Sequence, residues 1–404
     1  MILPDSASDR RALADRLQEQ GELAHPAWRA AVEAVPRELF LRPGVFLPTD
    51  DGRWQPVTPL TTKPEQWVGI AYSDQSLVTQ LDGHLTADQA DGPVAGFPTS
   101  SSTVPATVVA MLEALEVEDG QKALEIGTGT GYSTALMCHR LGEDAVTSIE
   151  VDPGVAARAD AALEAAGQST WTVTGDGLLG HPSRAPYDRI IATCAVRRVP
   201  YTWVRQTRPG GSILATVGSW SYGTGLARLT VSPDGTAEGR IIGRSSFMPA
   251  RAQAPVPLSG DLSARAAYAD SERKATITPG ALDDWMPAFL TQLAAPGTQL
   301  LRAVTGDGDE TVYLFDTERE SFAALSPDGS GWKVRQGGPV RLWDAVEAAV
   351  EAWDEAGRPD ISTVRLHVTD RSHTYWIGGQ RIATAARSYW IGEKPALRWD
   401  HRVV

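Results

Sequence analysis

The sequence has little cysteine: Cys138 and Cys194 are the two cysteines among its 404 residues. They lie far apart, each in an apolar stretch, so we predict two buried free thiols in a reducing cytoplasm rather than a disulfide. The seven histidines are scattered along the chain. Histidines and cysteines placed in this way do not supply the clustered ligands of a metal centre, so we expect no metal.

Long hydrophobic runs and an excess of positive charge are missing as well. No apolar run approaches the roughly 18 residues that a membrane-spanning helix needs, and the amino terminus lacks the pattern of a signal peptide. The formal net charge is -13, and the sequence contains no basic stripe. We therefore expect neither a membrane nor a nucleic acid as partner, because nucleic-acid binding relies on clustered positive charge. The oligomeric state is left open.

What the sequence does contain is a glycine-rich turn between two apolar runs. Residues 123–126 are predicted to form a buried strand, and the turn Gly-Thr-Gly-Thr-Gly follows at 127–131. A helical pattern covers 132–141, and a second apolar run at 145–151 carries Glu150 near its end. This order is typical of the nucleotide-binding half of a doubly wound α/β sheet. The glycines let the backbone approach a ligand closely, and the acid is placed to accept hydrogen bonds from a ribose diol.

The glycine spacing discriminates between ligands. A dinucleotide turn needs Gly-x-Gly-x-x-Gly, so that a helix amino terminus can take a pyrophosphate. Here the spacing differs, and the acidic Glu125 is a poor neighbour for a pyrophosphate. The pattern resembles motif I of class I methyltransferases, whose ligand S-adenosyl-L-methionine carries no phosphate. The alternative is a turn that merely connects strand to helix, but the agreement of strand, turn, helix and Glu150 argues against it.

The alternation of strands and helices continues beyond this motif. We predict helices at 153–166 and 199–207, strands at 171–174, 187–193 and 212–217, and a hairpin from 226–231 and 237–242. Strands alternating with helices of this length specify a mainly parallel sheet, and hence an α/β fold. Asp176, just after strand 171–174, would lie at the switch point of the sheet, within reach of an adenine amino group. A simple turn residue is the alternative there.

A run of hydroxyl side chains precedes a predicted helix at 108–115. The run Ser100-Ser101-Ser102-Thr103 is followed by Val104 and Pro105. A hydroxyl before a helix usually caps it, at about 1 kcal/mol, and that explains one or two of the four. We therefore expect at least one of these hydroxyls to contact substrate or cofactor.

The rest of the chain suggests three segments. Residues 10–40 have helical spacing, and 41–69 are expected to be loop-like because Pro43, Pro48, Pro56, Pro59 and Pro64 interrupt any regular element. A linker at about 252–258 precedes a stretch that holds seven of the thirteen tryptophans, with strands at 311–315 and 364–368 and a helix at 343–353. We predict a helical, substrate-facing region at 1–98, a methyltransferase core at 99–251, and a tryptophan-rich α+β domain at 259–404. The tryptophans serve either peptide recognition or ordinary packing.

Several motifs in register resemble the protein-L-isoaspartate O-methyltransferase family. They are VPRELF, YSDQSLVTQ, the hydroxyl cluster before VVAMLEAL, LEIGTGTGY, VTSIEVD, GDG, APYDRIIAT, QTRPGG and FMPAR, spread over residues 10–251. The resemblance implies a class I, Rossmann-like enzyme that uses S-adenosyl-L-methionine and releases S-adenosyl-L-homocysteine. The cofactor residues that we predict are Glu125, Gly127, Thr128, Gly129, Gly131, Tyr132, Glu150, Val151, Asp176 and Gly177. The substrate residues that we predict are Thr103 and Ser102 as catalytic, with Ser101, Tyr72 and Asp74 in binding.

One departure from the family pattern bears on the substrate. The family's repair enzymes have a serine two residues before the helix-opening proline, and Thr103 stands at that position here. With the long tail, this resembles a sub-branch found in clusters that mature ribosomal peptides, such as those of ATP-grasp (graspetide) and lanthipeptide type. The resemblance implies methylation of an ordinary aspartate, whose ester collapses to a succinimide (aspartimide) and can hydrolyse to isoaspartate. Repair of isoaspartyl proteins is the alternative, and an inactive peptide-binding module is the alternative of another class.

Overall fold

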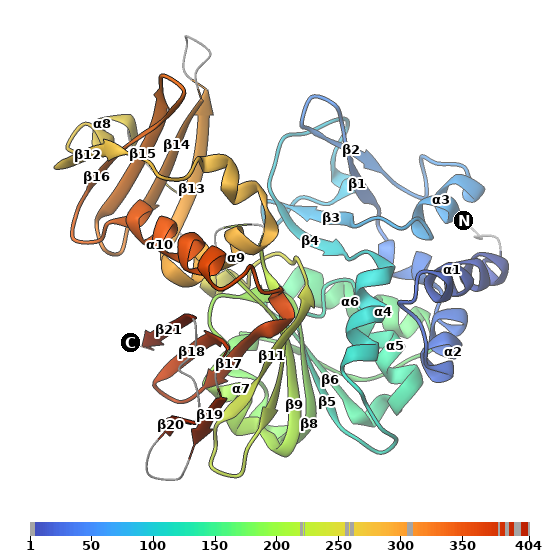
Figure 1. The fold of residues 1–404 in the computed structure, drawn as a ribbon. Coiled ribbons are helices and arrows are strands. Elements are labelled where there is room, and N and C mark those ends of the chain that lie inside the picture. The colour runs from blue at the N-terminus through green and yellow to red at the C-terminus, as the bar shows by residue number, and fades with distance from the viewer. Residues whose placement is uncertain are drawn as a thin grey trace. The chain divides into compact units, whose positions relative to one another are not determined.

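The chain divides into two compact units (Figure 1). The computed structural model describes residues 5–218, 221, 223–254, 258, 262–304, 310–378, 380–383, 388–391 and 397–402. Unit 1 takes in the described residues up to Thr193 together with Thr202–Leu214, and unit 2 takes in Cys194–Tyr201 and the described residues from Ala215 onward. The segment boundaries near 98 and 251 were inferred from changes in sequence pattern and stay a prediction.

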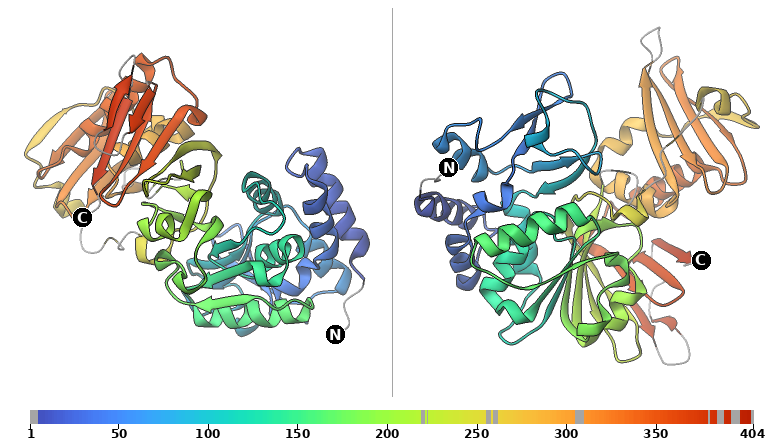
Figure 2. Two further views of the ribbon diagram at one scale, coloured as in Figure 1. Left: turned by 90° about the horizontal axis from the view of Figure 1, so that it is seen from below. Right: turned by 180° about the vertical axis from the view of Figure 1, so that it is seen from behind.

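Unit 1 is built on a parallel sheet, whose green strands are seen from two further sides in Figure 2. In spatial order its strands are β8 (Tyr187–Val196), β5 (Ala123–Ile126), β6 (Val146–Glu150) and β7 (Trp171–Thr174). Each of the three pairs is parallel. Buried parallel strands are continuously apolar, which is why the runs of β5 and β8 could be found in the sequence, whereas the edge strand β7 is only partly buried. The predicted doubly wound α/β fold is confirmed.

Helices connect these strands close to the predicted bounds. They are α4 (Pro105–Ala114), α5 (Tyr132–Leu141), α6 (Pro153–Ala165) and α7 (Tyr201–Gln206), with short 3-10 turns η3 (Glu143–Ala145), η4 (Gly177–Leu179) and η5 (Pro182–Arg184). Strand β9 (Thr207–Val217) begins earlier than predicted. Residues 209–211, which precede the strand predicted at 212–217, are therefore part of β9.

The amino-terminal part of unit 1 differs from the prediction. Helices α1 (Ala7–Glu19) and α2 (Pro26–Ala34) are followed by η1 (Arg37–Leu41). The stretch 41–69, expected to be loop-like, instead forms β1 (Val45–Pro48), β2 (Trp54–Val57) and α3 (Pro64–Ala71). With β3 (Leu77–Leu81), η2 (Ala87–Gln89) and β4 (Pro98–Ser102), they complete a four-stranded sheet in the order β2-β1-β3-β4.

The prolines misled the prediction because three of them occupy positions in strands and helices that tolerate proline. Pro48 is the last residue of β1, and Pro56 lies in the edge strand β2, where an N–H is dispensable. Pro64 opens α3, where the first N–H groups have no partner within the helix. Three of the five prolines thus mark ends and edges of elements rather than their absence.

Unit 2 is an α+β assembly, as predicted for the tail. One set of antiparallel strands has the order β10 (Gly225–Val231), β11 (Ala237–Arg244), β17 (Val364–Val368), β18 (Ser372–Ile377), β21 (Leu397–Arg402). A second sheet has the order β12 (Ser271–Lys274), β16 (Gly331–Gly337), β15 (Ser321–Asp328), β14 (Glu310–Asp316), β13 (Thr298–Val304). The remaining elements are β19 (Gln380–Ala383), β20 (Ser388–Ile391), α8 (Leu262–Ala266), α9 (Trp285–Ala294), α10 (Leu342–Glu355), η6 (Arg251–Gln253), η7 (Pro279–Asp283) and η8 (Ile361–Thr363).

The tryptophans of unit 2 pack inside it. Trp343 is fully buried in the core between α10 and the second sheet, and its indole donates to Glu347 at 2.9 Å. Trp376 is buried as well, and the other described tryptophan side chains after residue 251 are half-buried. The packing role weighed for these residues therefore has direct support, while a part in peptide recognition stays a prediction.

Candidate functional site

The parallel strands of unit 1 end together, and their carboxyl ends place the predicted cofactor residues on one edge. The register pairs Ile126 with Ile149 and Glu150 with Thr174. The residues that follow these strands therefore share the edge at which ligands bind in open α/β sheets. They include the glycine turn, Val151 and Asp176.

The glycine turn needs glycine for its backbone conformation. Gly127, Gly129 and Gly131 have φ values of 95°, 56° and 89°, in the region that side chains disfavour. The N–H groups of Gly127 and Thr128 donate to the Ile149 carbonyl at 2.8 and 3.1 Å, which ties the turn to the neighbouring strand. The turn is thus a fixed loop at the sheet edge, half-buried at Gly127 and Gly129 and buried at Thr128 and Gly131.

Glu150 links the two sides of this edge. One carboxylate oxygen accepts from the N–H of Gly129 at 2.9 Å, and the other accepts from the N–H of Asp152 at 3.0 Å. The side chain is buried, with 8% exposed. Because a carboxylate can accept about four hydrogen bonds, each oxygen retains capacity for one hydroxyl of a ribose diol. The residue type and the fixed geometry fit the predicted cofactor.

The outer part of the edge offers an apolar surface and a second acid. The Val151 side chain is 43% exposed. Asp176 is exposed and caps η4, accepting from the N–H of Leu178 at 2.9 Å. Gly177 packs so closely on β5 that a Cβ there would lie 2.5 Å from Cγ2 of Ile126. Val151, Asp176 and Gly177 therefore lie where an adenine would be expected, and their contacts with it stay a prediction.

Three other predicted cofactor residues, Glu125, Thr128 and Tyr132, are buried inside the protein. Glu125 is fully buried and accepts hydrogen bonds from the hydroxyls of Ser133, Thr134 and Ser148, while burial raises the pKa of its carboxyl. Thr128 shares a hydrogen bond of 2.6 Å with Ser148. Through these hydrogen bonds, Glu125 and Thr128 stabilise the turn from inside the protein. A direct contact of either side chain with the cofactor stays a prediction.

Tyr132, the first residue of α5, is also buried. Its ring meets Phe40 edge-on at 5.9 Å, and burial raises the pKa of its hydroxyl to about 12. A Cβ at Gly131 would lie 3.5 Å from the same Phe40 ring. The segment VPRELF therefore packs against the start of the helix that follows the cofactor turn.

The hydroxyl cluster at residues 100–103 lies at the end of strand β4, the hydroxyl strand, and does not cap helix α4. Ser100, Ser101 and Ser102 belong to β4, and α4 begins at Pro105 with no side-chain hydrogen bond at its amino cap. Ser102 is buried, whereas Ser101 and Thr103 are half-buried. The carbonyl oxygen of Ser101 lies 3.7 Å from the position of a Cβ at Gly129. The structure thus brings the predicted substrate residues beside the predicted cofactor turn.

Sequence reasoning missed two further contacts at this edge, one that ties β4 to Asp152 and one that ties β8 to the glycine turn. The amide of Gln80 donates to Asp152 at 3.2 Å and accepts from the Thr99 hydroxyl at 2.9 Å. The Thr193 hydroxyl donates to the carbonyls of Ile126 and Gly127 at 3.1 and 2.5 Å. The sequence signal was the presence of both residues in the motifs YSDQSLVTQ and APYDRIIAT.

Arg37 is the other residue that was missed, because it was predicted only as part of the helical stretch 10–40. It is fully buried, and its Nη2 donates to the Ser102 hydroxyl at 3.3 Å and to the Thr103 carbonyl at 3.2 Å. Its Nη1 donates to the carbonyls of Ala71 and Ser73, the latter at 3.4 Å. The signal that could have identified it is the motif VPRELF.

The two remaining substrate predictions lie beside Arg37. Tyr72 is buried, and its hydroxyl donates to Glu38 at 2.5 Å and accepts from the Arg37 N–H at 3.1 Å. With its hydroxyl so engaged, Tyr72 holds the turn that carries Asp74, which is exposed. A contact of Tyr72 or Asp74 with substrate stays a prediction.

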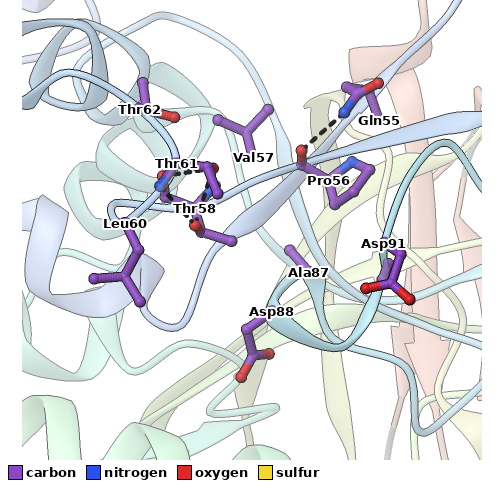
Figure 3. Close-up of a pocket in the computed structure, with 11 residues that line it drawn as sticks. Gln55, Pro56, Val57, Thr58, Leu60, Thr61, Thr62, Ala87, Asp88 and Asp91 are labelled. Atoms are coloured by element: carbon purple, nitrogen blue, oxygen red, sulfur yellow. Dashed lines mark hydrogen bonds between the residues drawn. The ribbon is translucent and has the colours of Figure 1, made fainter.

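A separate open pocket of about 620 Å³ lies at the far edge of the amino-terminal sheet (Figure 3). It is lined by the β2 edge, by Thr58 and Thr61, which hydrogen-bond to each other at 3.0 Å, and by Asp88 and Asp91. None of the predicted site residues lines it.

The sequence predicted neither a metal site nor a membrane-spanning helix, and both points can be examined in the part of the chain that the structure describes. Within it, no three histidine, cysteine, aspartate or glutamate side chains gather as metal ligands would, and no helix has the length and apolarity to cross a bilayer. Neither Cys138 nor Cys194 forms a disulfide; Cys138 is buried as predicted, while Cys194 is half-buried, which differs from the prediction.

The fold and this sheet edge define a class I methyltransferase domain. Residues 71–254 match the family model described as protein-L-isoaspartate(D-aspartate) O-methyltransferase. The protein-L-isoaspartate O-methyltransferase of Anaeromyxobacter dehalogenans strain 2CP-1 is 40% identical over 184 residues, which cover 45% of this chain and 86% of that protein. The one from Ignicoccus hospitalis is 32% identical over 228 residues, covering 56% and 90%.

The chain belongs to the protein-L-isoaspartate O-methyltransferase family. A solved structure with this name aligns over 89% of this chain and 96% of its own, with 21% identity and a TM-score of 0.49. A second, from Plasmodium falciparum and solved with S-adenosyl-L-homocysteine, covers 60% and 98%, with 12% identity and a TM-score of 0.44. Members of the family are carboxyl methyltransferases that use S-adenosyl-L-methionine, so the predicted enzyme class and cofactor are confirmed.

Proposed function

We propose that this protein transfers a methyl group to the free α-carboxylate of an isoaspartyl residue in a protein or peptide, where the side-chain carbonyl forms the peptide bond. The observation that carries the proposal is the approach of the hydroxyl strand to the glycine turn, with the Ser101 carbonyl 3.7 Å from a Cβ position at Gly129. A cofactor on the turn and a carboxylate at the hydroxyls would then be neighbours. The names of the relatives support isoaspartate as the substrate residue.

The cofactor would be held by groups whose chemistry matches it. The turn at Gly127, Gly129 and Gly131 offers backbone without side chains, and Glu150 offers acceptors for a ribose diol. Val151 and Asp176 offer an apolar face and an acceptor for an adenine amino group. When bound, S-adenosyl-L-methionine supplies a methyl group on a sulfonium centre.

The protein's own task is then to place a carboxylate. A carboxyl group with a reference pKa near 3.9 is already ionised at neutral pH and acts as its own nucleophile, so no general base is needed. Orientation alone is worth up to roughly 7–11 kcal/mol of the barrier. The hydroxyls of Thr103 and Ser102 can hold the carboxylate oxygens as neutral donors, which leaves the nucleophile its charge. The resulting ester has a better leaving group, so the next backbone nitrogen can close a succinimide and release methanol.

A second candidate substrate is an ordinary aspartate in a ribosomally made, modified peptide. Thr103 stands where the family's repair enzymes have serine, and residues 255–404 lie beyond the match to the family model. Both features support a specialised substrate, for which unit 2 offers additional surface. A cytoplasmic setting suits either substrate.

Mass spectrometry on two substrates tests these proposals. The protein and S-adenosyl-L-methionine are incubated with a short peptide that contains isoaspartate and with an aspartate-containing precursor peptide, linear and ring-closed. A gain of one methyl on the isoaspartyl peptide alone supports repair. A transient methyl gain followed by net loss of water on the precursor alone supports peptide maturation.

Calorimetric measurement of cofactor affinity tests whether the protein is instead an inactive binding module. An inactive, methyltransferase-like binding module would bind a peptide without binding S-adenosyl-L-methionine. Measurable affinity for the cofactor combined with methylation of either peptide would exclude that class. Absence of both would refute the enzymatic proposal.

A further inference from the structure

Arg37 is a buried cation in a polar network of unit 1, next to the hydroxyl strand. Its side chain has no exposed surface, and it donates to carbonyls and hydroxyls of two segments, Ala71–Ser73 and Ser102–Thr103. One fork-shaped guanidinium therefore joins the turn before β3 to the end of β4. Both segments carry predicted substrate residues.

The charge of Arg37 is met by the face of the Tyr132 ring, 5.8 Å from Cζ to the ring centroid, and by the charge of Asp74, but by no directly paired carboxylate. Among the described residues Arg37 has no carboxylate within ion-pair distance, and its Nε has no hydrogen-bond partner. The adjacent Glu38 instead accepts from the hydroxyls of Ser6, at 2.6 Å, and Tyr72, at 2.5 Å. Burial lowers the pKa of Arg37 to about 10, so the group is still a cation at neutral pH. Burying a cation without a directly paired carboxylate is costly, which makes Arg37 a candidate for a functional role.

The contact with Ser102 has a consequence for that hydroxyl. Because Ser102 Oγ accepts from Nη2 of Arg37, its own hydrogen is directed elsewhere and can be donated. A hydroxyl that accepts a charge-assisted bond is polarised and becomes a stronger donor. The same Nη2 fixes the carbonyl of Thr103, and with it the backbone that carries the half-buried Thr103 hydroxyl.

We propose that Arg37 is a positioning residue for methyl transfer, which orients the Ser102 and Thr103 hydroxyls toward the substrate carboxylate without touching the substrate. The inference rests on the proposed function. Arg37 acts indirectly, because a guanidinium in direct contact with the carboxylate would stabilise its charge and make it a weaker nucleophile. One serine between the two transmits orientation while keeping the acceptor anionic.

The network contains a matched control. Arg10 donates to the Ser6 hydroxyl at 2.6 Å and to the Glu33 carbonyl at 2.6 Å, in the same polar network but away from the hydroxyl strand. A purely structural role for Arg37 predicts that, in both Arg37→Lys and Arg10→Lys, activity falls only as far as stability falls. A positioning role predicts that they differ in kcat.

The experiment compares the wild type, Arg37→Lys, Arg10→Lys, Ser102→Ala and the double variant Arg37→Lys/Ser102→Ala. For each, kcat and KM are measured on the peptide that the wild type methylates, with calorimetric affinity for S-adenosyl-L-methionine and a melting temperature. We expect Arg37→Lys to lower kcat about 30- to 100-fold, because a misplacement on the order of 1 Å has such effects, while cofactor affinity stays within about threefold. Arg10→Lys should leave kcat within about threefold, since it does not reach the hydroxyl strand.

The double variant decides how Arg37 acts. Because Arg37 acts through Ser102 as well as through the Thr103 backbone, the double variant should lose less activity than the product of the two single losses, since coupled residues are not additive. Ser102→Ala keeps the buried cation, so this arm remains informative if Arg37→Lys folds poorly. Additive losses, or an Arg37→Lys kcat within twofold of the wild type, would overturn the inference. A wild type that methylates no substrate would instead refute the proposed function itself.

Discussion

The carboxylate of Glu150 and the backbone N–H of Gly129 form a hydrogen bond of 2.9 Å between the end of β6 and the glycine turn after β5. The bond requires the turn to bend back toward the neighbouring strand, which the φ of 56° at Gly129 permits. A second bond, from the Asp152 N–H to the other oxygen, holds the carboxylate from the opposite side. The acid that is proposed to bind the ribose thus also fixes the shape of the turn.

Glu150→Gln should weaken cofactor binding. The amide replaces one acceptor oxygen with a donor that faces an N–H or a ribose hydroxyl, at a cost of about 1.5–3 kcal/mol, or roughly 10- to 150-fold in the dissociation constant. Isothermal calorimetry with S-adenosyl-L-homocysteine measures the change. Glu164→Gln, on the exposed face of α6, is the control. Equal affinity of the two variants would contradict the assignment of Glu150.

Gly177→Ala should destabilise unit 1. The new Cβ would lie 2.5 Å from Cγ2 of Ile126, the buried last residue of β5, so the backbone has to move away from the sheet. Overpacking of this kind costs about 1–3 kcal/mol. Gly175→Ala, two residues earlier, meets no atom within 4 Å and serves as the matched control. Urea denaturation of the two variants makes the comparison, and a Gly177→Ala variant as stable as Gly175→Ala would refute the close approach.

Thr103→Val should slow methyl transfer while sparing the cofactor. The substitution keeps the shape of the side chain and removes a hydroxyl proposed to donate to a carboxylate, a bond worth about 1.5–3 kcal/mol. We expect kcat/KM to fall roughly 10- to 150-fold, with Thr103→Ser retaining most of the activity. Initial rates from mass spectrometry provide the measurement. Equal loss in the serine variant would point to packing of the threonine methyl group instead.

His373 should make the protein sensitive to mild acid. The residue is buried in unit 2, its Nε2 contacts the Val199 carbonyl at 3.1 Å, and Nδ1 has no partner among the described residues. Burial, together with the nearby His401, Arg198 and His367, lowers the pKa of His373 to about 4. As the pH is lowered from 6.5 to 4, the unfolded chain therefore takes up a proton that the folded chain does not. The free energy of unfolding decreases over this range by up to about 1.4 kcal/mol per pH unit.

Melting temperatures recorded from pH 4 to pH 7 test this expectation. His373→Gln removes the titrating group and should flatten the acid side of the profile, although burial also lowers the pKa of His401, which leaves a residual slope. His84→Gln, at an exposed position, should leave the profile unchanged. An unaltered slope in His373→Gln would assign the acid sensitivity to other groups.

Most of the cofactor side of the site could be predicted from local sequence. The glycine turn, Glu150 and Asp176 each follow an apolar run, and in a parallel sheet all carboxyl ends meet at one edge. Local order along the chain was therefore enough to bring them together. The inward direction of Glu125 and Thr128 could not be predicted, because it depends on the hydroxyls of Ser133, Thr134 and Ser148 around them.

The substrate side depended on contacts between distant segments. Arg37 and Ser102 are 65 residues apart, and no periodicity in the sequence links a 3-10 turn to a serine at the end of β4. Likewise, the prolines between 41 and 69 indicated a loop, until pairing in the sheet put Pro56 on an edge strand. The sequence by itself determined the parallel sheet and its cofactor turn, because strand, turn and helix patterns are local. Only the tertiary structure decided which buried groups hold the hydroxyl strand. Hydrogen bonds between residues far apart in the sequence, and the absence of an ion pair at a buried charge, leave no pattern in the local sequence.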